Sequence, residues 1–70
     1  MTATDRYLGS VTQFDDARGL GEVTRDDGTV FAFHCVSIAD GTRTIEHGAR
    51  VSFAPLLKLG RHEAADIRPA

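Results

Sequence analysis

The chain has 70 residues, enough for one domain but too few for both a core and a deep internal active site. Its 41% hydrophobic and 26% charged residues are ordinary for a globular domain and argue against a wholly disordered chain. The formal net charge is −2, with an acidic first half, whereas dedicated nucleic-acid binders usually carry a basic excess. The balance therefore argues against tight binding driven by phosphate contacts.

Cys35 is the only cysteine, which excludes an internal disulfide and a four-cysteine zinc site. A single free cysteine is typical of a reducing, intracellular setting. Residues 1–6 contain no apolar run, so we expect no signal peptide and no transmembrane segment, and we predict a cytoplasmic protein. We expect residues 1–6 to form a flexible lead-in and residues 7–70 to form the folded domain.

A strand is predicted from Tyr7 to Phe14, followed by a turn and a β-hairpin over residues 18–34. Asp27-Gly28 lies between the two strands of the hairpin and predicts a primed turn, because such turns need positive φ and glycine supplies it. Alternation along the hairpin gives it one core face and one open face. The residues expected on the open face are Leu20, Glu22, Thr24, Ala32 and His34. A register in which Phe31, rather than Phe33, faces solvent is left open.

The second half of the chain predicts a short helical turn over Cys35–Ile38 and a fourth strand over Ala49–Ala54. Pro55 is expected to end that strand, and Leu56–Arg61 to form a connection. A fifth strand is predicted over His62–Arg68, with Ala65 and Ile67 on one face. The expected core residues are Val11, Val23, Phe31, Phe33, Val51, Phe53 and Ile67.

Five short strands with turn signals every 8–12 residues or so predict an all-β fold. Closing the sheet removes the exposed strand edges of so small a domain. We therefore expect a five-stranded antiparallel barrel of the oligonucleotide-binding (OB) type.

The order of motifs along the chain resembles a bacterial cold-shock domain over about residues 8–68. The matching segments contain Gly9, Val11 and Phe14, then Arg18 to Gly28, Phe33 to Ile38, Asp40-Gly41, Gly48 to Phe53, and Ala64 to Ile67. The family motif K-G-F-G-F-I corresponds to Arg18–Val23, and the motif V-F-V-H-F corresponds to Phe31–Cys35. The resemblance implies binding of single-stranded DNA or RNA through bases stacked on exposed aromatic side chains.

Most of those aromatic side chains are replaced in this chain. The replacing residues are Gln13, Leu20, Glu22, Ala32 and Cys35. One stacking contact contributes about 1–3 kcal/mol, so losing four costs up to about 4–12 kcal/mol. Glu22 also places a carboxylate where phosphates would approach. The resemblance therefore implies weak binding with little sequence preference, as an RNA chaperone or a regulator of gene expression.

The expected nucleic-acid-binding residues are Gln13, Phe14, Arg18, Leu20 and His34. Three of them have a structural interpretation as well, and for His34 it is an exposed histidine of the barrel with no role. Phe14 is also expected as a core or rim aromatic, and Arg18 as an ion-pair partner of the neighbouring acidic residues. His34 is the strongest candidate, because stacking on a base and donating to a phosphate are both within its chemistry.

The alternative function is a protein-interaction module on a retained cold-shock barrel. The connection carries three leucines, Leu56, Leu57 and Leu59, which either contact a protein partner or a second copy, or cover the open end of the barrel. We expect no catalytic residues, cofactor or metal, since no ligand or nucleophile spacing fits. Neighbouring residues on a strand point to opposite faces, so His34 and Cys35 are not expected to meet.

Overall fold

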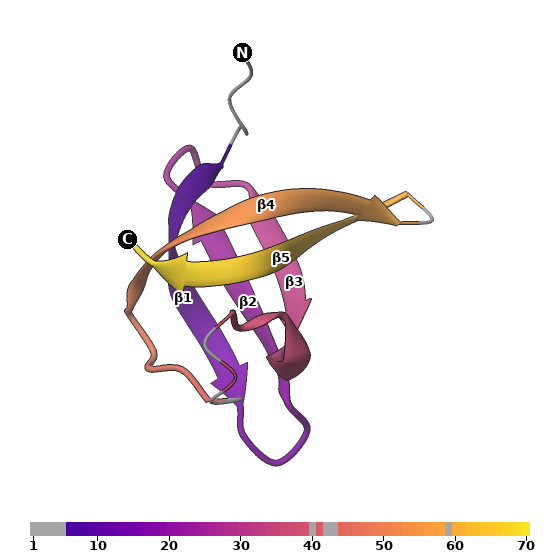
Figure 1. Ribbon diagram of the computed structural model, residues 1–70. Helices are drawn as coiled ribbons and strands as arrows, with labels where there is room; N and C mark the ends of the chain where they lie inside the picture. The colour runs from indigo at the N-terminus through magenta and orange to yellow at the C-terminus, as the bar shows by residue number, and fades with distance from the viewer. Residues whose placement is uncertain (1–5, 40, 42–43, 59) are drawn as a thin grey trace.

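The computed structural model of the chain describes residues 6–39, 41, 44–58 and 60–70, with the backbone alone at residues 57, 58 and 61. It contains five strands and one short 3-10 helix (Figure 1). The elements are β1 (Tyr7–Asp15), β2 (Leu20–Arg25), β3 (Val30–His34), η1 (Cys35–Ser37), β4 (Arg50–Lys58) and β5 (Arg61–Pro69). In this described part of the chain, no helix has the length and apolar character needed to cross a bilayer.

The strands close into a barrel in the order β1-β2-β3-β5-β4, which confirms the predicted all-β barrel of the OB type. All neighbouring strands pair antiparallel except β3 and β5, which are parallel. The exception arises because the chain leaves β3 through η1 and crosses to β4 before β5 returns beside β3 (Figure 1).

The interior of the barrel contains all seven of the expected core residues, each at most 3% exposed. Phe31 and Phe33 are both buried, so the register that placed Phe31 in solvent is wrong. Ile38 and Ala64 complete the core. Because Ala32 and His34 alternate with the buried rings along β3, they point outward, as the sequence predicted.

The β2–β3 turn differs from the prediction. Asp27 does not have positive φ; only Gly28 does, at 98°, and the Gly28 N–H donates to the Arg25 carbonyl. Arg25 N–H in turn donates to the Thr29 carbonyl. This is a three-residue loop with a glycine bulge, which needs only one residue at positive φ rather than the two of a primed turn.

The fourth strand does not end at Pro55 but continues to Lys58, and β4 and β5 extend together as an arm beyond the barrel (Figure 1). Beside β4, pairing with β1 stops at the Tyr7–Phe53 pair, so Pro55 lies on a stretch with a strand neighbour on one side only. A missing N–H is tolerated at such an edge. The expected connection over residues 56–61 is therefore mostly strand.

In β5 the buried residue beside Ile67 is Ala64, whereas Ala65 was expected. A register shift lies between the Ser52–Arg68 and Ala54–Ala65 pairs, and Asp66 has φ 51° there. The bulge adds one residue to β5 and resets its alternation. Arg6 secures this point, since its guanidinium donates to the Asp66 carboxylate at 2.8 Å and to the Asp66 carbonyl at 2.6 Å. The rest of the predicted lead-in, residues 1–5, lies outside the described residues.

Candidate nucleic-acid interface

The outward residues of β1, β2 and β3 form rows across the strands. Leu20 pairs with His34, and Glu22 lies between Gln13 on β1 and Ala32 on β3. Directly opposed residues on a sheet have Cβ atoms about 4.5–5.5 Å apart, so each row is one continuous contact surface. The structure thus brings three of the predicted binding residues, Gln13, Leu20 and His34, onto one face, which we call the outer face.

A bulge in β1 decides which way Gln13 and Phe14 point. The register between β1 and β2 shifts at Thr12, between the Val11–Val23 and Gln13–Glu22 pairs. Gln13 is therefore exposed, whereas Phe14 turns back toward the barrel and is half-buried. Its ring stacks parallel to that of Phe33, with centroids 5.7 Å apart. Phe14 consequently lies at the rim of the outer face, with one side of its ring occupied by the core.

Gly21 makes this stacking arrangement possible. A Cβ atom at Gly21 would lie 2.6 Å from the Phe33 ring and 2.6 Å from the Gln13 carbonyl oxygen. Only a residue without a side chain leaves the Phe33 ring enough room under β2.

Arg18 lies in the turn between β1 and β2, with its side chain 77% exposed. Its Nε is 3.8 Å from the Asp15 carboxylate, so the ion pair expected from the sequence is present. An exposed pair of this kind contributes at most about 1 kcal/mol. The guanidinium lines a shallow hollow of about 180 Å³ together with Gln13 and Leu20. Arg18 can therefore leave Asp15 at little cost and contact a phosphate.

A larger groove of about 470 Å³ crosses the outer face toward β5. It is lined by Leu20, Ala32, Phe33, His34, Val36, Ser37, Leu56 and Glu63. Val36 is 64% exposed and Leu56 is 43% exposed, so the groove offers apolar surface in place of aromatic rings. Sequence reasoning missed the contributions of Val36 and Glu63. Leu56 was expected either to contact a protein partner or a second copy, or to cover the open end of the barrel; it is exposed and lines this groove. The Leu57 side chain is not described, and Leu59 lies outside the described residues.

Two carboxylates flank Ala32 in the same row. Glu22 is opposite Ala32 on β2, and Glu63 is opposite it on β5. Within the described part of the chain, neither carboxylate takes part in an ion pair. Among the described residues, the centre of the outer face thus carries two carboxylates without an ion-pair partner, and negative charge at this position opposes the approach of phosphates.

His34 and Cys35 are closer than expected, because the Sγ atom of Cys35 lies 3.8 Å from Nδ1 of His34. The prediction that they do not meet is wrong, since β3 ends at His34 and Cys35 begins η1, where strand alternation no longer applies. Cys35 also packs against the core and lies beside Gly19. Among the described residues, no three His, Cys, Asp or Glu side chains gather in a way that could hold a metal ion.

The family model described as "'Cold-shock' DNA-binding domain" matches residues 7–70. The chain belongs to the cold-shock domain family. The "Cold shock-like protein CspA" of Stigmatella aurantiaca (strain DW4/3-1) is 43% identical to this cold-shock domain over 47 residues, which make up 64% of this chain and 69% of that protein.

A solved structure described as "drosophila Unr CSD456" superposes on this cold-shock domain with a TM-score of 0.82 at 20% identity. The match covers 97% of this chain and 28% of the longer chain, and it shows that the two share a fold. Membership of the family thus accounts for the barrel.

Proposed function

We propose that this cold-shock domain binds single-stranded RNA or DNA without catalysis, weakly and with little sequence preference, as an RNA chaperone or a regulator of gene expression. The observation that carries the proposal is the row in which Leu20 and His34 lie side by side on the outer face of a barrel of this family. The single-stranded nucleic acid would cross the groove beside Leu20 and His34.

The proposed contacts divide between bases and phosphates. His34 is exposed at the end of β3 and offers an imidazole for stacking or for donation to a phosphate. Leu20, 47% exposed, supplies apolar contact to a base. Arg18 and Gln13 at the edge of the face supply donors, and Phe14 adds the exposed edge of its ring.

Weak binding follows from what the face lacks. Ala32 and Glu22 occupy its centre, so no ring is present there for a base to stack on. The nearby carboxylates repel phosphates. Of the side chains proposed to contact the strand, Arg18 is the one with a permanent positive charge, so few of the counterions bound to the nucleic acid are released on binding. We accordingly expect the affinity to fall with salt, but less steeply than for a strongly basic protein. The proposal places the protein in the cytoplasm, where the single thiol of Cys35 stays reduced.

The test is fluorescence polarisation with labelled dT-rich and mixed single-stranded oligonucleotides, first in low salt and then at about 0.15 M salt. His34→Ala should weaken binding about fivefold or more, the lower end of what a lost stacking contact costs. His47→Ala is the matched control, because His47 is exposed and does not line the groove. Saturable binding that is unaffected by His34→Ala would refute the proposed face.

The same experiment addresses the alternative of a protein-interaction surface at Leu56, Leu57 and Leu59. The described one of these, Leu56, lines the groove of the outer face. Absence of oligonucleotide binding in low salt would refute the nucleic-acid proposal and direct the search to a protein partner at Leu56.

A further inference from the structure

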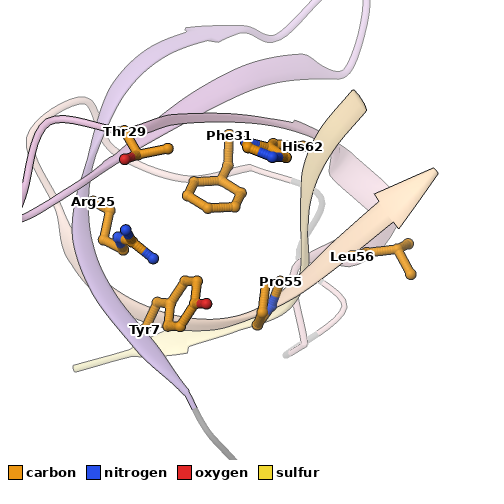
Figure 2. Close-up of a pocket in the computed structure, with 7 residues that line it drawn as sticks. All are labelled: Tyr7, Arg25, Thr29, Phe31, Pro55, Leu56 and His62. Carbon is orange, nitrogen blue, oxygen red and sulfur yellow. The ribbon is translucent and has the colours of Figure 1, made fainter. Parts of the chain in front are cut away.

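A second hollow, of about 270 Å³, opens at the mouth of the barrel beneath the β4–β5 arm. It is lined by Tyr7, Arg25, Thr29, Phe31, Pro55, Leu56 and His62. Figure 2 shows Arg25, Tyr7, Phe31 and Pro55 directed toward a common centre, whereas the Leu56 side chain points away from it. All five strands contribute at least one lining residue, so the hollow depends on the closure of the barrel.

The walls of the hollow are flat unsaturated groups. The Tyr7 and Phe31 rings meet edge to face, with centroids 5.8 Å apart. The Arg25 guanidinium lies over the Tyr7 ring at 4.3 Å from its centroid. The His62 imidazole stacks on Phe31 at 5.4 Å, with 24° between the planes. Unpaired nucleobases stack on aromatic rings, imidazoles and guanidinium planes of this kind.

The charge of the hollow favours a base over a phosphate. Arg25 hydrogen-bonds the Asp27 carboxylate, which fixes the guanidinium in place and offsets its charge. Thr29 adds a hydroxyl, and the remaining lining is largely apolar. A planar, uncharged heterocycle is therefore better matched than an anion to these walls.

The hollow adjoins the groove of the outer face. Leu56 on β4 is part of the lining of both, so the two lie on either side of that residue. Along β3, the outward residues Ala32 and Val30 lead from the groove to Thr29 at the mouth, and Val30 is 48% exposed. The distance from residue 34 to residue 30 is roughly 13 Å at 3.3 Å per strand residue. A strand lying on the outer face can reach the mouth of the barrel over that distance.

We propose that the mouth of the barrel is a nucleobase pocket, which takes one unpaired base of a strand held on the outer face. This inference rests on the proposed function. The pocket supplies the ring stacking that the centre of the outer face has lost. Tyr7, Arg25 and His62 form its stacking walls, and Thr29 and Pro55 limit its size.

The chain contains a reporter for this site. Tyr7 is the only tyrosine and there is no tryptophan, so intrinsic emission comes from the wall of the pocket alone. A base stacked against the phenol ring quenches its emission. A strand confined to the groove leaves the emission unchanged, because Tyr7 is not part of the groove.

In the first titration, the wild-type chain is added to an end-labelled mixed oligonucleotide and the polarisation of the label is recorded. In a parallel titration, the unlabelled oligonucleotide is added to the chain and the emission of Tyr7 is recorded. N-acetyltyrosinamide corrects for absorption by the bases, and ribose 5-phosphate serves as a probe without a base. His62→Ala removes one wall at an exposed position, and His47→Ala is the matched control. We expect saturable quenching by the oligonucleotide, no quenching by ribose 5-phosphate, and half-saturation shifted about fivefold or more by His62→Ala.

The outcomes separate the two proposals. Polarisation that saturates without quenching, or quenching that His62→Ala leaves unchanged, would overturn the pocket and leave the outer face intact. Absence of both signals in low salt would overturn both proposals. Saturable quenching that weakens in His62→Ala but not in His47→Ala would support the pocket.

Discussion

Glu22 is the residue whose replacement should change binding most. It lies on β2 between Gln13 and Ala32, at the centre of the outer face, and has no ion-pair partner among the described residues. A carboxylate and a phosphate about 4 Å apart repel each other by about 1 kcal/mol in water. Glu22→Gln should therefore tighten oligonucleotide binding about fivefold. Glu22→Phe adds a stacking contact of about 1–3 kcal/mol, for a total gain of about 30- to 1,000-fold.

Fluorescence polarisation with the same single strands measures both variants, and the difference between them separates charge from stacking. Glu46→Gln removes an exposed carboxylate that lines neither hollow of the outer face, so it controls for the change in net charge. If neither Glu22 variant binds more tightly than Glu46→Gln while both remain folded, the strand does not cross the centre of the outer face. The placement of the interface would then be wrong.

Two further predictions concern stability. Gly21→Ala should lower the free energy of unfolding by about 1–3 kcal/mol in urea, because the added methyl group meets the Gln13 carbonyl and the Phe33 ring; an unchanged midpoint would contradict the packing described. Hydrogen bonding from Arg25 holds the pKa of the Asp27 carboxyl well below its ordinary value of 3.8. A carboxyl whose pKa is depressed in the folded state stabilises the fold above its ordinary pKa, and this stabilisation is lost as the pH falls below that pKa. Asp27→Asn should therefore flatten the decline of the thermal midpoint in acid. Parallel curves of thermal midpoint against pH for the wild type and the variant would refute this prediction.

The barrel could be predicted from the sequence because its strands keep a period of two. Phe31 and Phe33 alternate with Ala32 and His34, and the structure buries both rings, which settles the register that the sequence left open. The prediction failed where alternation is interrupted. In β5 the bulge at Asp66 exchanged Ala65 for Ala64 in the core, and nothing in the local sequence marks an aspartate at positive φ.

The outer face was predictable only over the residues that are close in sequence. Leu20 and His34 belong to one hairpin, so local register places them together. Glu63 reaches the same row through the parallel pairing of β3 with β5, which depends on the path of the whole chain. The nucleobase pocket was missed for the same reason, since Tyr7 and His62 come from opposite ends of the sequence.

The alternation that made the fold predictable also lets the outward residues of a strand vary independently of its core residues. Val23 is fully buried, whereas the preceding residue, Glu22, points outward from the same strand. Because successive side chains project to opposite faces, replacing an outward ring removes a stacking contact without opening a cavity in the core. The rings of Tyr7, Phe31 and Phe53 are packed on one another inside the barrel and are needed for stability. At the mouth of the barrel, Tyr7 is only partly buried and lies beside Arg25 and the exposed His62, so these three side chains offer a stacking surface that does not depend on the outer face.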